Sequence, residues 1–127
     1  NIIIETRVSN ATVPKVRVGA AYMIIRNTAE TGAEIVSASA PVAETVELHT
    51  HINENGIMRM RKVNSYKIPG NSEIILKPMG RHIMLIDLIK PLNSGEDYEL
   101  TLNFSDGSQK KLTVPIISHE DTPLTEQ

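Results

Sequence analysis

The sequence predicts an all-β sandwich or barrel. Short runs rich in β-branched and aliphatic residues recur along the 127 residues, and Gly, Pro, Asn, Asp or Ser residues bound most of them. No segment carries the apolar spacing of a convincing amphipathic helix. Many short strands at regular intervals, separated by turn residues, are typical of sandwiches and barrels.

Five strands are predicted in the first half of the chain. Pro14 marks a loop after the first, residues 28–32 form a turn after the second, and Pro41 breaks the third. The fourth and fifth flank Asn53-Glu54-Asn55-Gly56, which is a hairpin signal. The predicted strands span residues 2–8, 19–26, 34–39, 43–52 and 57–63.

The second half contains five further candidates. Turns or loops at 69–71, 77–80, 93–95 and 105–108 separate them. The alternation is clearest in the fourth of these, where Tyr98, Leu100, Leu102 and Phe104 share one face. The predicted strands are 66–68, which is short, then 73–76, 82–88, 98–104 and 110–116.

The length suits one domain, because domains most often contain about 100–150 residues. We expect residues 1–117 to form it and the polar, acidic residues 118–127 to be a disordered tail. The run Ile2-Ile3-Ile4 is too short for the apolar part of a signal peptide, and no run is long enough to span a membrane. A start at Asn1 instead of Met suggests a processed or trimmed form.

Composition excludes several classes of function. A net charge of −2 and an aromatic content of 3% offer no basis for a nucleic-acid or membrane-surface partner. The absence of cysteine excludes disulfides, a thiol nucleophile, an iron–sulfur centre and a blue-copper electron-transfer site. No nucleophile-elbow, P-loop or H-E-x-x-H motif occurs, so we do not expect an enzyme.

Histidines and methionines gather around the predicted 43–63 hairpin and the 82–88 strand. The hairpin contains His49, His51, Met58 and Met60, and the strand begins His82-Ile83-Met84. His82 and Met84 share a face because they are two residues apart on a strand. Neutral imidazole nitrogens and thioether sulfurs are ligands that suit Cu(I).

Two pairings of the hairpin remain open. If residues 53–56 form the loop, His51 faces Met58 and His49 faces Met60. A tighter Asn55-Gly56 turn instead places His51 opposite Met60. Both pairings keep the same histidines and methionines on one face of the hairpin, because the shift preserves parity.

The spacing H-x10-M-x21-H-x-M over His49, Met60, His82 and Met84 resembles that of the PCuAC family of periplasmic copper chaperones. Flanking segments resemble it too, and together they cover residues 3–116. These segments are Gly19-Ala20-Ala21-Tyr22-Met23, Pro41-Val42-Ala43-Glu44, Val46-Glu47-Leu48-His49, Val63 after Met58-Arg59-Met60-Arg61, and Leu76-Lys77-Pro78 before Gly80.

The resemblance implies a cupredoxin-like Greek-key fold and a Cu(I) site made of His49, Met60, His82 and Met84. It also implies a periplasmic protein that delivers copper to the CuA site of cytochrome c oxidase. The implied partners are the CuA-bearing subunit or another assembly chaperone. A chaperone that must hand over its cargo should carry these ligands near the surface.

Other residues receive more ordinary interpretations. His51 and Met58 lie outside the four-residue pattern, so packing or support of the site is expected more than ligation. Met23 is expected in the core, Met79 in a loop near the site, and Arg59 and Arg61 on the opposite face of the strand from Met60. The tail offers only His119 and no methionine, so we expect a single copper site.

Two alternatives to a delivery protein remain. The same site could serve a periplasmic copper buffer or resistance protein without an oxidase client. The chain could also be a metal-free β-sandwich interaction module in which the His/Met pattern is coincidental.

Overall fold

The computed structural model describes residues 2–13 and 15–118, and it contains ten strands. All ten predicted strands are confirmed, most of them extended by one or two residues. No helix among these residues is long and apolar enough to cross a membrane. The strands are β1 (Ile2–Asn10), β2 (Val18–Asn27), β3 (Ala33–Ser39), β4 (Ala43–Glu54), β5 (Ile57–Val63), β6 (Tyr66–Ile68), β7 (Ser72–Leu76), β8 (His82–Leu88), β9 (Asp97–Phe104) and β10 (Gln109–Ile117).

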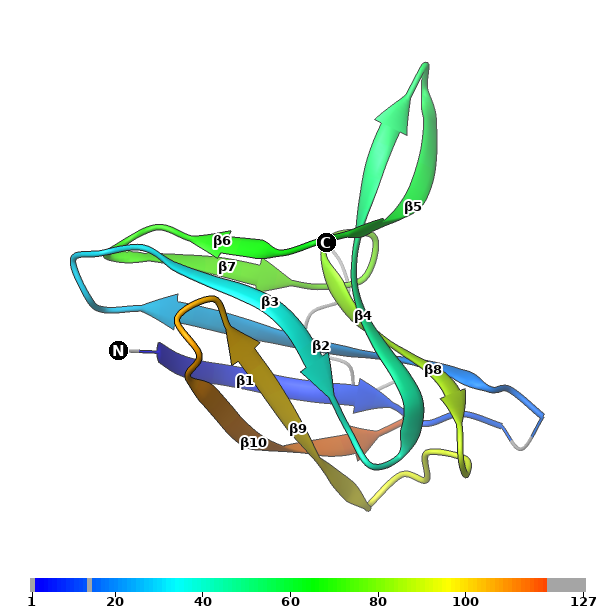
Figure 1. Cartoon of the computed structure of the whole chain (residues 1–127). Helices are drawn as coiled ribbons and strands as arrows, with labels where there is room; N and C mark the ends of the chain where they lie inside the picture. Colours follow the sequence, from blue (N-terminus) through cyan, green and yellow to red (C-terminus); the bar gives the residue numbers. More distant parts are fainter. Residues whose placement is uncertain (1, 14, 119–127) are drawn as a thin grey trace.

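The strands form one continuous path that folds into two layers. Its order is β5-β4-β8-β2-β1-β10-β9-β3-β6, and β7 pairs with β2 outside this path. In Figure 1, β3 and β9 cross in front of β1 and β2. The predicted sandwich architecture is therefore confirmed. Among the strand pairs that the structure describes, all but one run antiparallel.

That exception is β1 with β10, which run parallel. Ser9 pairs with Ile116 and Asn10 with Ile117. β1 belongs to the back layer and β10 to the front layer, so their pairing joins the two layers along one side of the sandwich. The first and last strands share no connecting turn, so a pattern of local turns did not predict their direction.

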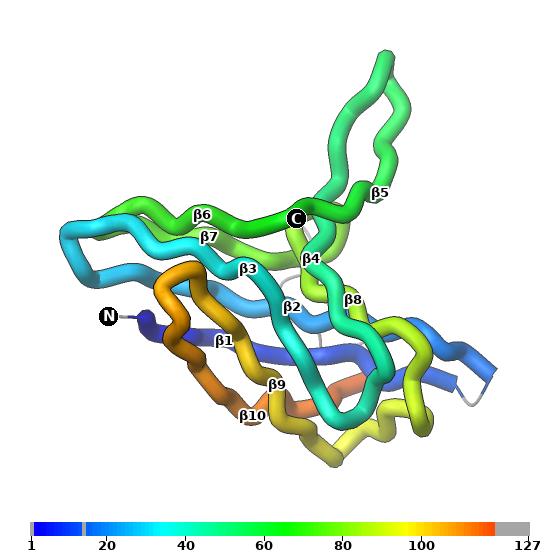
Figure 2. The backbone as a smooth tube through the Cα atoms, in the orientation of Figure 1, coloured from blue at the N-terminus to red at the C-terminus, as the bar shows by residue number. Residues whose placement is uncertain are grey.

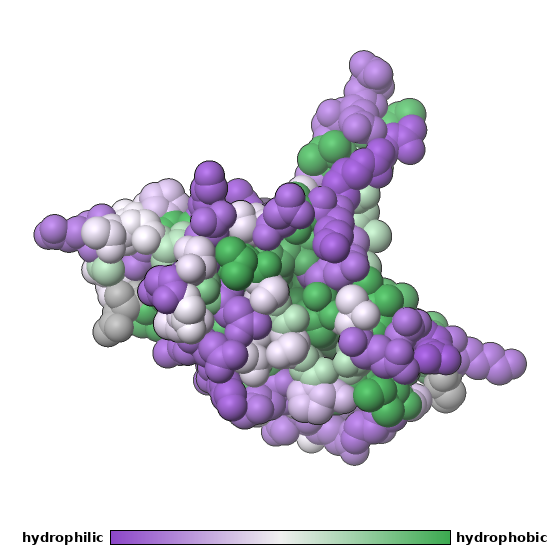
Figure 3. All heavy atoms as spheres, viewed as in Figure 1, coloured by the Kyte–Doolittle hydropathy of each residue, from purple (hydrophilic) through white to green (hydrophobic). Residues whose placement is uncertain are grey.

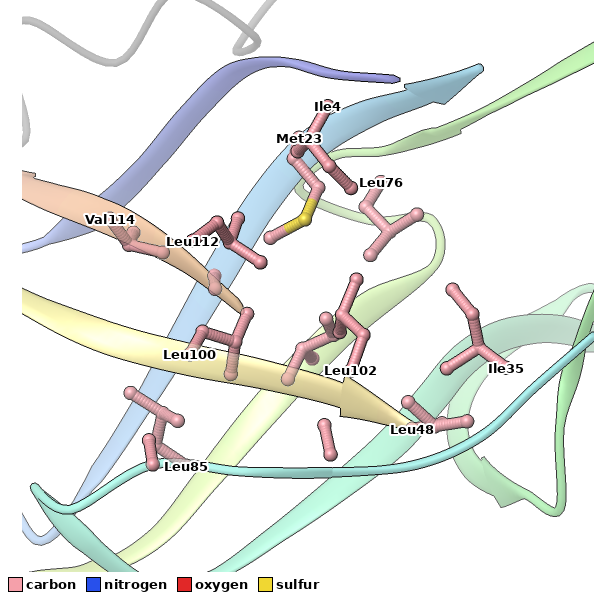
Figure 4. Close-up of a cluster of buried hydrophobic side chains, with 14 of the residues drawn as sticks. Ile4, Met23, Ile35, Leu48, Leu76, Leu85, Leu100, Leu102, Leu112 and Val114 are labelled. Carbon is pink, nitrogen blue, oxygen red and sulfur yellow. The ribbon is translucent and has the colours of Figure 1, made fainter. Parts of the chain in front are cut away.

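The core lies between the two layers. Figure 4 shows side chains from β1, β2, β3, β4, β7, β8, β9 and β10 meeting there. Met23 is fully buried, as predicted, and the alternating set on β9 also points inward. Large side chains with almost no exposed surface include Met23, Ile25, Ile35, Ile68, Leu76, Ile83, Leu85, Leu92, Leu100, Leu102 and Val114.

The β4–β5 hairpin projects from this body (Figures 1 and 2). Glu54 pairs with Ile57, so Asn55 and Gly56 alone form the turn. Their φ angles of 55° and 86° are those of a type I′ turn, which Asn-Gly adopts readily. The tighter of the two predicted pairings is thus confirmed, and the pairing with a 53–56 loop is wrong.

Candidate metal centre

Two histidines face each other where the hairpin leaves the body of the molecule. His49 on β4 pairs directly with His82 on β8, and their ring centroids lie 5.6 Å apart. Both side chains are buried, with exposed fractions of 8% and 4%. Residues 33 positions apart in the sequence therefore form one buried imidazole pair.

The two methionines of the pattern lie on the same face, one on each side of this pair. Met60 on β5 is opposite His51, and Met84 on β8 is opposite Glu47. Each is therefore a diagonal neighbour of His49, at a Cβ separation of about 7–8 Å. Met60 is 41% exposed, whereas Met84 is half-buried. The expectation of ligands near the surface is met by Met60 but not by His49 and His82, which are buried.

His51 joins the group from β4, two residues after His49 and on the same face. Its ring centroid lies 5.4 Å from that of His82. The Nδ1 atoms of His51 and His82 lie 3.2 and 3.1 Å from the same acceptor, the carbonyl oxygen of Gly80. Because a carbonyl only accepts hydrogen bonds, both Nδ1 atoms carry the proton. Each Nε2 atom therefore presents its lone pair to a metal ion.

His49 has the opposite arrangement. Its Nε2 atom lies 2.9 Å from Oε1 of Glu47 and donates to that carboxylate. Its Nδ1 atom is buried and has no hydrogen-bond partner. A buried imidazole nitrogen with a free lone pair is an atom that a metal ion would satisfy.

Glu47 connects this histidine to a cation. The hydrogen bond from His49 and the positive charge of Lys62, whose Nζ lies 3.7 Å from Oε2, hold the pKa of Glu47 below its usual value. The carboxylate is thus kept ionised and oriented towards His49. Carboxylates in this position fix the ring of a metal-binding histidine and raise its basicity.

Burial also keeps His82 neutral. Removal from water disfavours the charged imidazolium and lowers the pKa of His82, although its bond to Gly80 partly offsets this effect. Histidine binds metals only in its neutral form. The protein therefore holds this imidazole in the state that a metal ion requires.

Tyr66 on β6 is a functional residue that the sequence analysis missed. Its hydroxyl accepts a hydrogen bond from the backbone N–H of His49 at 3.0 Å. It also donates to the carbonyl oxygens of His49 and His82, the second at 2.7 Å. Burial raises the pKa of Tyr66 to about 12, so the hydroxyl remains protonated. A side chain from the front layer thus fixes the backbone of both buried histidines.

The loop that supplies the Gly80 carbonyl is a tight turn. The N–H of Gly80 donates to the carbonyl of Lys77 at 3.0 Å, and Pro78 and Met79 occupy the two central positions. Met79 has a φ of 66°, the left-handed conformation that a type II turn requires at this position. Met79 is 65% exposed, in agreement with its predicted place in a loop.

The donor set decides which ions the site suits. Among the residues that the structure describes, no three His, Cys, Asp or Glu side chains form a group that could hold a metal ion. Other donor atoms on the face of these imidazoles include the thioether sulfurs of Met60 and Met84. Such a set suits a soft ion and gives hard cations such as Mg²⁺ and Ca²⁺ little.

The basic residues of β5 lie away from these donors, as predicted. Arg59 and Arg61 project from the face opposite to Met60. Both form ion pairs with Glu54, at 3.0 and 3.2 Å. The carboxylate of Glu54 therefore partly neutralises the positive charge of these two arginines.

Comparison with known proteins agrees with this description. Residues 2–116 match the family described as "Putative lipoprotein LpqE-like". The chain is 38% identical over 98 residues to "Putative lipoprotein Lxx21020" of Leifsonia xyli subsp. xyli. It is 35% identical over 103 residues to "Uncharacterized protein RP573" of Rickettsia prowazekii. These matches cover 76% and 80% of this chain but only 59% and 57% of the relatives.

Solved structures show the same fold. The copper-bound PCuAC domain from PmoF2 superimposes with a TM-score of 0.78 at 20% identity, covering 92% of each chain. The solution structure of CuI-DR1885 from Deinococcus radiodurans gives a TM-score of 0.72 at 28% identity, covering 91% of this chain and 79% of that one. The chain therefore belongs to the LpqE-like lipoprotein family, and its single all-β domain has the cupredoxin-like fold of PCuAC domains.

Proposed function

We propose that this domain binds one Cu(I) ion as cargo, through His49, Met60, His82 and Met84. The observation that carries the proposal is the buried His49–His82 pair. The Nδ1 atom of His49 has no hydrogen-bond partner, the Nδ1 atom of His82 is bonded to Gly80, and both side chains share a face with Met60 and Met84 by strand register. The 28% identity to the chain of the CuI-DR1885 structure supports the same assignment.

The ligand types explain why a carrier would use this site. Thioethers bind soft Cu(I) and have no proton to lose, and the imidazoles are neutral when they bind. The four ligands add no charge, so the bound ion keeps its single positive charge. Without thiolates the hold on copper is weaker than in a cysteine site, which favours release to another protein. The role is one of transport, with no chemical step for an enzyme.

We further propose that the protein is periplasmic and delivers copper to the CuA site of cytochrome c oxidase. The recipient would be the CuA-bearing subunit or another assembly chaperone. The family description names lipoproteins, which is consistent with an extracytoplasmic location. The chain spans a little over half the length of its relatives, so the partners of the whole protein are part of what we propose.

Competition with a Cu(I)-specific chelator tests the site. The wild type should take up one tightly held Cu(I), and Met60→Leu and Met84→Leu should each weaken binding about tenfold or more, or about 1.4 kcal/mol. Met23→Leu is the matched control, because Met23 is buried in the core and the change nearly conserves volume. No Cu(I) uptake by the folded wild type would refute the site and favour a metal-free interaction module.

A deletion strain tests the delivery step. At limiting copper it should contain an under-metallated CuA centre, which the wild-type gene restores and a His49→Ala variant does not. The measurement is CuA occupancy together with oxidase activity. Full CuA occupancy in the deletion strain would favour the copper buffer instead.

A further inference from the structure

The outer half of the projecting hairpin carries soft donor atoms that the four-ligand site does not use. Met58 lies two residues before Met60 on β5, so both side chains share one face. His51 on β4 is directly opposite Met60. Met58 is 47% exposed, so core packing does not account for it. In Figure 3 the projecting hairpin shows hydrophobic residues, in green, among its hydrophilic ones, in purple.

We propose that His51, Met58 and Met60 form a second, outer Cu(I) site that captures the ion and passes it inwards. This inference rests on the proposed function, because it supplies copper to the same buried pair. Directly opposed residues have Cβ atoms about 4.5–5.5 Å apart, and diagonal ones about 7–8 Å. His51 is opposite Met60 and diagonal to Met58, so the three side chains can meet above the hairpin.

The hydrogen bond of His51 prepares it for this role. Its Nδ1–H donates to the Gly80 carbonyl, which orients the ring and leaves Nε2 free to bind a metal. The two remaining donors are thioethers, which favour Cu(I) over Cu(II) and over hard cations. The outer site therefore selects the same ion in the same oxidation state as the inner site.

Met60 belongs to both sets, and this shared ligand provides the transfer. Cu(I) bound by His51, Met58 and Met60 exchanges the first two ligands for His49, His82 and Met84, while Met60 stays bound. No electron or proton needs to be supplied, because copper remains Cu(I) and every ligand is neutral. The exposed fraction of the donor residues decreases from the outer site to the inner one, from 47% for Met58 through 41% for Met60 to 8% for His49.

The outer site is isolated by removing the inner one. In a His49→Asn/His82→Asn double variant, both inner imidazoles are removed while His51, Met58 and Met60 remain, and Cu(I) should still bind, at least tenfold more weakly than in the wild type. Adding Met58→Leu to this background should abolish that residual binding. The measurement is chelator competition, with ¹³C-methyl NMR of Met58 to locate the ion. A folded double variant that binds no Cu(I) would overturn the outer site.

The transfer itself is tested by the rate of copper uptake. In an otherwise unchanged chain, Met58→Leu should slow Cu(I) uptake from a chelator at least fivefold, as measured by stopped-flow absorbance. Met79→Leu is the matched control, because Met79 is another exposed methionine but lies in the 77–80 turn, outside the hairpin. Equal rates in Met58→Leu and wild type would overturn the capture role. A wild type that binds no Cu(I) would instead refute the inner site, so the two failures are distinguishable.

Discussion

At the scale of single residues, Tyr66 is the side chain on which the geometry of the site most depends. Tyr66→Phe removes one oxygen and leaves the N–H of His49 and two carbonyls without their partner. Leaving a buried polar group unpaired costs about 1–3 kcal/mol, so the free energy of unfolding should fall by that amount. Cu(I) affinity should fall as well, because the backbones of His49 and His82 lose their common anchor.

Denaturant unfolding and chelator competition measure these two effects separately. Tyr98→Phe is the control, because Tyr98 is also deeply buried but stands on β9, which pairs with β3 and β10 and not with β4 or β8. It should leave Cu(I) affinity unchanged. An equal loss of affinity in both variants would mean that Tyr66 acts only through overall stability.

The shared face of His49, Met60, His82 and Met84 could be predicted from the sequence because parity on a strand fixes which side chains lie on the same side. Their choice as copper ligands came from the family resemblance and stays a prediction. The hydrogen bonds around them could not be predicted. Glu47 and His49 are two residues apart, a spacing that permits many arrangements, and Tyr66 reaches the site from the opposite layer. A tyrosine in a three-residue strand gives no local sign that its hydroxyl is buried against two histidine backbones.

At the scale of elements, the Asn55-Gly56 turn sets the pairing of the hairpin. Gly56→Ala places a side chain at a φ of 86°, although no atom lies within 4 Å of the added Cβ. The cost is therefore conformational, about 1–2 kcal/mol. Backbone amides of β5 should exchange faster with solvent, and the His51–Met60 pair should loosen.

Gly107→Ala is the matched control for this change. Gly107 has a φ of 90° and equally open surroundings, but it lies in the β9–β10 turn, away from the histidines. Hydrogen exchange monitored by NMR should show faster β5 exchange in the first variant only, and uptake of Cu(I) should slow in that variant only. Slower uptake in both variants would mean that the conformation of the hairpin has no specific role in the capture of Cu(I).

Local sequence patterns predicted where the strands lie but not how all of them pair. Alternation and turn residues located all ten strands, because most strands bury one face and the turns between them are rich in Gly, Asn or Pro; β5, exposed on both faces, was located by the Asn-Gly turn before it. The choice between the two hairpin pairings depended on φ angles, which the sequence Asn53-Glu54-Asn55-Gly56 permits in either form. The parallel β1–β10 pair joins residues as distant in the sequence as Ser9 and Ile116, and no local pattern links such residues.

At the scale of the whole molecule, burial of His82 makes stability depend on pH. Burial lowers its pKa in the folded state, whereas an unfolded histidine titrates near about 6.5. As the pH falls, the unfolded chain therefore takes up the proton first. The contribution to stability is complete above the unfolded pKa and decreases as the pH drops below it.

Denaturant unfolding of the copper-free protein between pH 7.5 and 5.5 measures this dependence. His82→Asn removes the titrating ring but keeps a donor for the Gly80 carbonyl. The free energy of unfolding should fall less steeply with acid in this variant than in the wild type. Parallel curves for the two proteins would mean that His82 titrates alike in both states.

The strand order has a consequence for solubility. β5 and β6 end the path of strands, so each leaves one row of backbone donors and acceptors open to pairing with another chain. β6 has only three residues, and β5 carries three cations, Arg59, Arg61 and Lys62, within seven residues. Charges on an edge strand hinder the sheet-to-sheet joining that leads to aggregation. The basic residues of β5 thus oppose aggregation through this projecting edge strand, which the exposed methionines would otherwise favour.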